Sequence, residues 1–178
     1  MFRKILSYGV IAGLIVGTVS SGLIVAMAEH PPTSYGMLIG YTTMLVALSA
    51  VFVGIKKYRD NDLGGTIRFF PAFGMGLAIS FIASVFYVLA WEAAQAITHM
   101  DFAGSYSQML IDQQKAKGVS GEALAKLIAE MEQFKIQYAN PLFRLPMVFA
   151  EIFPVGVLVS LVSAGLLRNN RFLPLKRA

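Results

Sequence analysis

The chain lacks cysteine, has one tryptophan and two histidines, and carries few charged residues. Without cysteine, disulfides, thiolate metal sites and cysteine nucleophiles are all excluded. Charged residues make up 14% of the sequence, whereas soluble domains average about 25%. No glycine-rich phosphate loop is present, and no Ser-His-Asp arrangement can be argued. We therefore expect no enzymatic activity and no cofactor.

Hydrophobic residues dominate what is present, at 56% of 178 residues with a mean hydropathy of +0.63. A run of about 20 apolar residues spans the hydrocarbon core of a bilayer. Four such runs occur, at about 5–28, 37–55, 69–92 and 147–167. The first is longer than the apolar region of a signal peptide, so we expect it to be retained. The sequence predicts a single all-α membrane domain, residues 1–178, built as a bundle of four transmembrane helices.

Basic residues gather on one side of the predicted membrane. The N-terminus, the 56–68 loop and the tail after residue 167 together hold ten lysines and arginines against two aspartates. The other side carries balanced charge. By the positive-inside rule, both termini are predicted to be cytoplasmic. The basic excess then favours contact with anionic membrane lipids and gives no support to nucleic-acid binding.

Residues 101–140 leave the predicted membrane as an amphipathic helical hairpin on the extracytoplasmic side. We expect a first helix from Ser105 to Lys117, closed by Gly118, and a second that begins at the N-cap Ser120. The second helix has apolar residues at helical spacing: Leu124, Leu127, Ile128, Met131, Phe134 and Tyr138. This face could cap the bundle, lie in the lipid interface or dock a partner helix.

Small residues recur every fourth position in the predicted spans, where they let neighbouring backbones approach closely. The clearest rows are Gly9, Gly13 and Gly17 in the first span, and Gly156 and Ser160 in the last. The partner helix could belong to the same chain, to a second copy in a homo-oligomer, or to another membrane protein.

The inner loop between the second and third spans has two interpretations. It could be a basic anchor with a turn at Gly64-Gly65, or a cradle for an anionic lipid headgroup. The basic residues available for such contacts are Lys56, Lys57, Arg59 and Arg68.

Glu151 is the most conspicuous polar residue of the last span. Counted from Leu167, it lies about 24 Å up the helix, roughly 6 Å inside the outer edge of the core. Pro154 frees the carbonyl of residue 150 beside it and favours a kink. A candidate polar pocket therefore comprises Glu151, Pro154, Arg144, Trp91 and Glu92. Glu151 could instead be a structural acceptor for Trp91, Tyr87, Ser20, Ser21 or Arg144.

The histidines lack local ligand spacing, so we expect no metal site. A zinc ion would require the outer loops to converge. The residues concerned would be Glu29, His30, Glu92, His99 and Asp101.

Four segments carry a resemblance to a known family. They are Met37-Leu-Ile-Gly-Tyr-Thr-Thr-Met44, Gly54-Ile-Lys-Lys-Tyr-Arg-Asp-Asn-Asp-Leu-Gly-Gly65, Asn140-Pro-Leu-Phe-Arg144 and Glu151-Ile-Phe-Pro-Val-Gly156. The chain resembles the domain-of-unknown-function family numbered 4199 over nearly its whole length. The resemblance implies a small integral protein of the bacterial inner membrane and brings no catalytic residues with it.

Two functions follow as hypotheses. The protein is an accessory or scaffold protein that binds other membrane components through its outer hairpin and glycine faces. Alternatively, it is a small lipid- or ion-handling protein that works through the pocket at Glu151.

Overall fold

The computed structural model describes residues 1–28 and 35–174, without the side chains of residues 20, 21, 23–28, 35–37 and 39. Every regular element in these residues is an α-helix, which confirms the predicted all-α class. The helices are α1 (Phe2–Ala28), α2 (Tyr35–Asp62), α3 (Phe69–Thr98), α4 (Phe102–Ala116), α5 (Gly121–Ala139) and α6 (Pro141–Leu167). Helices satisfy their backbone hydrogen bonds within one segment, so they suit a solvent that offers none.

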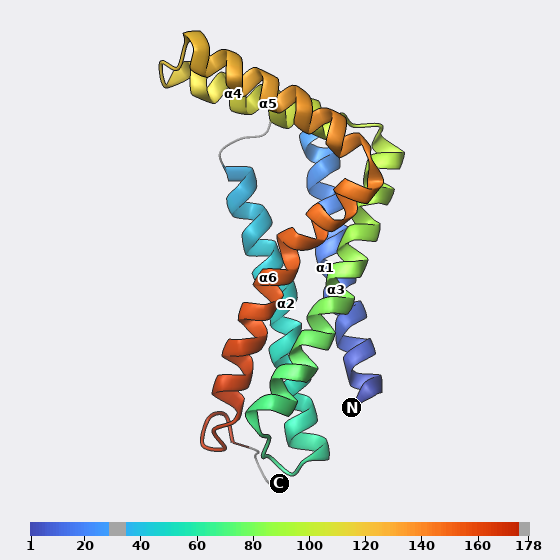
Figure 1. Ribbon diagram of the computed structural model, residues 1–178. Coiled ribbons are helices and arrows are strands. Elements are labelled where there is room, and N and C mark those ends of the chain that lie inside the picture. Colours follow the sequence, from blue (N-terminus) through green and yellow to red (C-terminus); the bar gives the residue numbers. More distant parts are fainter. Residues whose placement is uncertain (29–34, 175–178) are drawn as a thin grey trace.

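The long helices α1, α2, α3 and α6 run side by side (Figure 1). Helix α3 packs against α1, α2 and α6, while α2 also packs against α1 and α6. Their shared core is apolar and includes Val16, Leu48, Val51, Met75, Ile79 and Ile152, each fully buried.

Three of the described helices are long and apolar enough to cross a membrane: α1 over Phe2–Val19, α3 over Phe69–Thr98 and α6 over Pro141–Leu167. Helix α2 is of similar length, but its last two turns are rich in charge. These charged residues are Lys56, Lys57, Arg59, Asp60 and Asp62.

Helices α3 and α6 extend further than the apolar runs predicted. Helix α3 continues past residue 92 to Thr98, where His99 ends it in the left-handed conformation, with φ 51°. Helix α6 begins at Pro141, because the Asn140 side chain accepts a hydrogen bond from the amide of Leu142 and proline is well tolerated in a first helical turn. Pro146 therefore lies inside α6, as Pro154 does, and the helix bends in this half (Figure 1).

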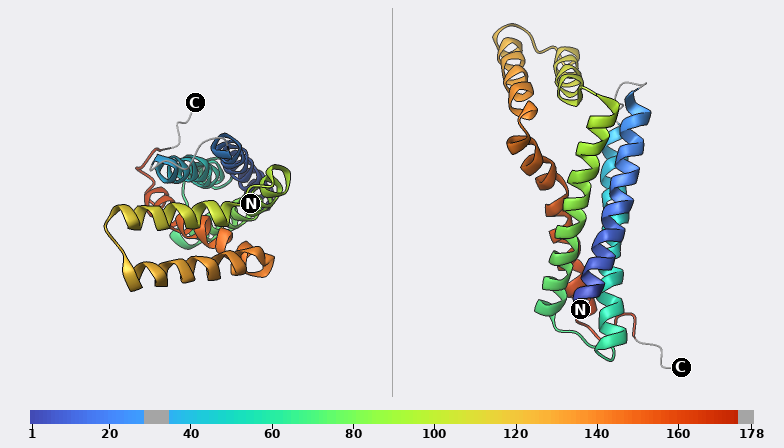
Figure 2. Two further views of the ribbon diagram at one scale, coloured as in Figure 1. Left: turned by 90° about the horizontal axis from the view of Figure 1, so that it is seen from above. Right: turned by 90° about the vertical axis from the view of Figure 1, so that its right-hand side faces the viewer.

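Helices α4 and α5 lie side by side across the end of the molecule opposite the N-terminus (Figure 2). Helix α4 begins earlier than predicted because the Asp101 side chain accepts a hydrogen bond from the amide of Gly104. Gly118 and Gly121, with φ of 84° and 62°, form the turn between the two helices. Ser120 is the N-cap residue of α5, although its side chain makes no capping bond.

Candidate functional site

A polar and aromatic junction joins the α4–α5 hairpin to the long helices. Trp91 Nε1 donates a hydrogen bond to the Tyr138 hydroxyl at 2.8 Å, and Gln95 Nε2 donates to the same oxygen at 3.2 Å. Arg144 forms a two-pronged ion pair with Glu92, at 2.7 and 2.5 Å, and also donates to the Tyr138 carbonyl at 3.2 Å. The junction thus ties the ends of α3 and α5 to the start of α6.

Aromatic rings fill the apolar side of this junction. The ring centroids of Trp91 and Phe102 lie 4.9 Å apart, edge to face, and those of Phe102 and Tyr138 lie 5.6 Å apart. Phe134 and Tyr106 continue the cluster into the hairpin. Burial raises the pKa of Tyr138, so its hydroxyl is neutral and can accept the two N–H donors. Close aromatic pairs of this kind hold the base of the hairpin in one orientation.

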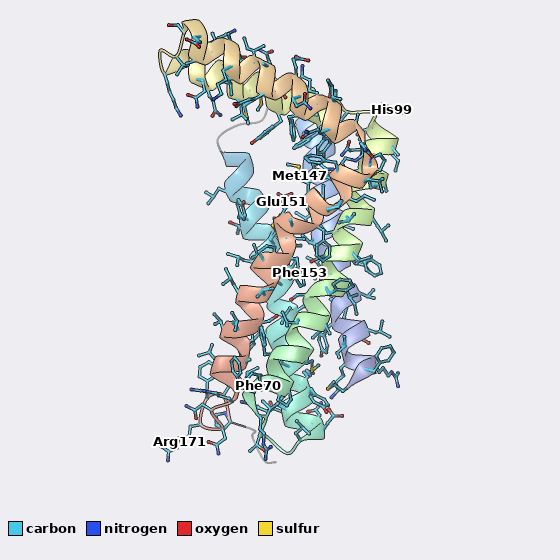
Figure 3. The ribbon with its side chains drawn as sticks, in the orientation of Figure 1. Phe70, His99, Met147, Glu151, Phe153 and Arg171 are labelled. Carbon is cyan, nitrogen blue, oxygen red and sulfur yellow. The ribbon has the colours of Figure 1, made fainter. Side chains whose placement is uncertain are left out.

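The predicted pocket residues are divided between two places. Trp91, Glu92 and Arg144 belong to the junction, where Arg144 pairs with Glu92 and Trp91 bonds to Tyr138. Glu151 lies further along α6, in its bent part, as Figure 3 shows. The hydroxyl of the buried Tyr87 donates a hydrogen bond to Oε2 of Glu151 at 3.4 Å. The Glu151 side chain is exposed at the protein surface. The alternative donors Ser20 and Ser21 have side chains outside the described residues.

Pro154 lies inside α6 just after Glu151 and has an exposed ring. Because proline has no amide hydrogen, the carbonyl of residue 150 loses its usual helical partner. The bend of α6, the carboxylate and the Tyr87 hydroxyl are therefore found together. This arrangement could exchange a proton or hold a small cation.

The residues proposed for the inner headgroup cradle have separate roles. Arg59 is fully buried and donates to the carbonyls of Phe172 at 3.0 Å and Leu173 at 2.6 Å. It also pairs with Asp60 at 2.7 Å, and Lys56 pairs with the same carboxylate at 2.5 Å. Arg59 therefore fastens the chain after α6 to the end of α2 and is not accessible to a headgroup.

Lys57 and Arg68 are exposed at the same end of the molecule, and no ion pair involves either within the described residues. Each remains available to an anion. Asp62, which the charge balance of the loop also includes, pairs with Lys4 of α1.

The small residues of the spans are used between helices of the same chain. A Cβ atom added to Gly13 would lie 2.4 Å from Cβ of Phe86 on α3, and one added to Gly9 would lie 2.7 Å from Ile82. Gly17 faces Ala90 in the same way. The Ser80 hydroxyl lies 3.2 Å from that of Ser160, with Gly156 packed beside them. These positions allow α1 and α6 to approach α3 closely.

No group of three or more histidine, aspartate or glutamate side chains that could hold a metal ion occurs in the described part of the chain. Glu29 and His30, which a zinc site would have needed, lie outside the described residues.

The sequence did not reveal Gln95 as a polar partner at the junction, nor did it reveal Tyr138. Tyr138 falls on the apolar face of α5, where its spacing indicated packing alone. A tyrosine on a buried helical face requires a partner for its hydroxyl, and this requirement was the available indication.

One comparison with known proteins is informative. The model of the family described as a protein of unknown function, DUF4199, matches residues 7–169. No curated protein and no solved structure matches the chain significantly.

Proposed function

The chain belongs to the protein family DUF4199, and we propose that it is a multi-pass protein of the bacterial inner membrane that acts as an accessory or scaffold protein for other membrane components. Its α4–α5 hairpin is the surface that binds them. The observation that carries this proposal is the way the hairpin is fixed at its base while its length projects away from the long helices.

The proposal includes α2 as a fourth transmembrane helix beside α1, α3 and α6. One face of α2 buries Leu48 and Val51 in the shared core, while Leu45, Val46 and Val53 on its other faces are exposed. A helix that is apolar on all sides is stable only when protein or lipid surrounds it. A bilayer around the molecule supplies that surrounding for α2.

The orientation follows from the distribution of charge. The start of α1, the end of α2, the start of α3 and the end of α6 lie at one end of the molecule, opposite the hairpin (Figure 1). The basic residues Arg3, Lys57, Arg68, Arg168 and Arg171 are found there, whereas Lys176 and Arg177 lie outside the described residues. The positive-inside rule then gives cytoplasmic termini and an extracytoplasmic hairpin.

The hairpin has features that suit a docking element. It contacts the long helices at its base and extends sideways beyond them in two views (Figures 1 and 2). Ile128 and Ile136 of α5 are 39% and 70% exposed and lie about 80° apart around the helix, with Glu132 between them. Burial of a large apolar side chain contributes about 1.5–3 kcal/mol, so a partner that covers both would gain a substantial part of its affinity.

Photo-crosslinking in native membranes tests the scaffold function. A crosslinking residue at position 128 or 136 is expected to capture a membrane protein, whereas one at Lys126 or Glu130, on the polar face, is expected to capture little. The double variant Ile128→Ser/Ile136→Ser should weaken co-purification at least tenfold with unchanged thermal stability. Capture of lipid alone, or equal protein capture from all four positions, would overturn the docking role.

Glu151 supports a second candidate function, the handling of an ion or a lipid. An exposed carboxylate at membrane depth is costly unless it is hydrated, protonated or paired, so such groups commonly mark ion pathways. The Tyr87 hydroxyl at 3.4 Å and the carbonyl of residue 150, which Pro154 leaves without its helical partner, are polar groups near Glu151.

Flux measurements in proteoliposomes distinguish the two functions. If Glu151 handles ions, the wild-type protein should conduct protons or monovalent cations, and Glu151→Gln should abolish the flux. Glu92→Gln serves as the control, because that carboxylate belongs to the hairpin junction. Absence of flux through the wild-type protein removes the ion-handling candidate and leaves the scaffold function unaffected.

A further inference from the structure

A cleft of about 440 Å³ lies between the start of α1 and the end of α2. These helix ends lie at the end of the molecule opposite the hairpin (Figure 1). The residues that line the cleft from α1 are Arg3, Lys4, Ser7, Tyr8 and Ile11. Lys57 and Asn61 line it from α2. Of these seven residues, only Lys57 was part of the predicted sites, so the cleft is a new feature of the tertiary structure.

Both walls of the cleft pass from charged or polar residues to apolar residues toward the middle of the long helices. On α1, the row Arg3, Ser7 and Ile11 passes from cationic to polar to apolar at intervals of four residues, and Ile11 is 47% exposed. From Arg3 to Ile11 the helix rises about 12 Å. The headgroup layer on each side of a bilayer is about 5–8 Å thick, so this rise leads from headgroups into the hydrocarbon.

The α2 wall repeats this gradient. Asn61 and Lys57 line the cleft, and Val53, one turn further into the membrane, is exposed and apolar. The two antiparallel walls thus present cations and amide or hydroxyl donors at one level and apolar surface at the next.

Positive charge in the cleft is only partly neutralised. Lys4, which also lines the cleft, donates to the Lys57 carbonyl at 3.2 Å and pairs with Asp62. Arg3 and Lys57 form no ion pair with any described residue, and none of the described lining residues is acidic. Two cationic side chains are therefore left to face the cleft.

Tyr8 packs between the two helices that form the cleft. Its ring lies against Gly54 of α2, where an added Cβ atom would be 3.0 Å from the ring carbons. This close approach positions the tyrosine between the two helices, and its hydroxyl adds a donor to those of Ser7 and Asn61.

We propose that this cleft binds the phosphodiester of an anionic phospholipid from the cytoplasmic leaflet. Arg3 and Lys57 hold the phosphate, the hydroxyl and amide donors complete its hydrogen bonds, and the acyl chains run along Ile11 and Val53. A free phosphate would satisfy the same donors but would leave the apolar half of the cleft unused, and this difference favours the lipid.

Native mass spectrometry of the full-length protein in detergent tests the proposal. Dioleoyl phosphatidylglycerol is the anionic probe, dioleoyl phosphatidylcholine is the zwitterionic one, and inorganic phosphate is the soluble competitor. The first phosphatidylglycerol should bind more tightly than phosphatidylcholine, and millimolar phosphate should not displace it. Since each basic residue near a membrane surface contributes about 1 kcal/mol, Arg3→Gln/Lys57→Gln should weaken that first binding about 30-fold.

The matched control is Arg168→Gln/Arg171→Gln, which removes two charges from exposed residues at the same end of the molecule. It should change binding less than twofold. Equal losses in both double variants, equal binding of the two lipids, or displacement by inorganic phosphate would each overturn the proposal. If the Arg3 and Lys57 double variant does not fold, Lys57→Gln against Arg171→Gln carries the same comparison, with an expected loss of about fivefold.

Discussion

Arg59 provides the most direct test of how the chain after α6 is held. It is 0% exposed and lies at the end of α2. Its guanidinium donates to the carbonyls of Phe172 and Leu173 and, at 3.5 Å, to that of Leu167. Replacement by alanine removes every one of these donors together with one of the two partners of Asp60.

The size of the effect follows from these bonds. The contacts with Phe172 and Leu173, at 3.0 and 2.6 Å, are short, and a hydrogen bond to a charged group contributes about 1.5–3 kcal/mol. Lys56 still pairs with Asp60, which limits the loss on that side. The two bonds together contribute about 3–6 kcal/mol, so we expect Arg59→Ala to lower the free energy of unfolding by about that amount. Arg59→Lys keeps the charge without the planar fork and should recover part of the loss.

Equilibrium unfolding in mixed micelles measures the free energy, and a second assay locates the change. The chain has no native cysteine, so one introduced at Phe172 reports on this segment alone. The Phe172 ring packs edge to face on Phe52, with centroids 6.4 Å apart. Thiol labelling at position 172 should become faster in the Arg59→Ala background. Unfolding within about 0.5 kcal/mol of the wild type, the range of an exposed substitution such as Arg68→Ala, would refute the assignment.

Further predictions concern the hairpin junction and the helix contacts. Arg144→Ala leaves Glu92 without its partner, so amide hydrogen exchange in α4 and α5 should increase. Fluorescence of Trp91, the sole tryptophan, should shift to the red as water enters the junction. Unchanged emission and exchange would contradict a structural role for this ion pair. Gly13→Ala should destabilise the protein by about 1–3 kcal/mol through overpacking against α3, measured by the same unfolding assay. Gly165→Ala, where an added Cβ meets no described atom, should be neutral or slightly stabilising, because alanine favours a helix more than glycine does. Equal losses at both glycines would show that the close approach of α1 to α3 at Gly13 does not cause the loss there.

Some features of this molecule depend on patterns that are local in the chain. Apolar runs and the scarcity of charge predicted an all-α protein with helices that suit a membrane, because each such helix satisfies its own backbone. The turn at Gly118 and the N-cap at Ser120 were likewise predictable, since they depend on residues within a few positions of each other.

Helix ends were predicted less well where polar residues continue an apolar helix. Helix α3 runs past Glu92 to Thr98, and α6 begins at Pro141, before the apolar run itself. In both cases the extra turns are held by the hairpin junction, which depends on residues far apart in the sequence. Hydropathy alone could not reveal those turns.

In the candidate site, too, contacts between nearby residues were predictable and contacts between residues far apart in the chain were not. Glu151 and Pro154 could be named together because they lie on one helix a few residues apart. Arg144 was expected near Glu151 as well, but it pairs with Glu92, which is 52 positions away in the chain. Which carboxylate lies within reach of Arg144 depends on how α3 and α6 pack, and this packing places Glu92 beside it.

The sequence by itself determined the all-α architecture, the apolar helices that suit a membrane, and the end of the molecule where positive charge accumulates. Composition and periodicity specify these properties. The tertiary structure decided which cations are free. Packing buried Arg59 under the chain that follows α6 and left Arg3 and Lys57 facing a common cleft. The physical reason is that a guanidinium or ammonium group in a basic segment looks the same in sequence whether carbonyl oxygens or open surface surround it, and only the folded chain supplies those oxygens.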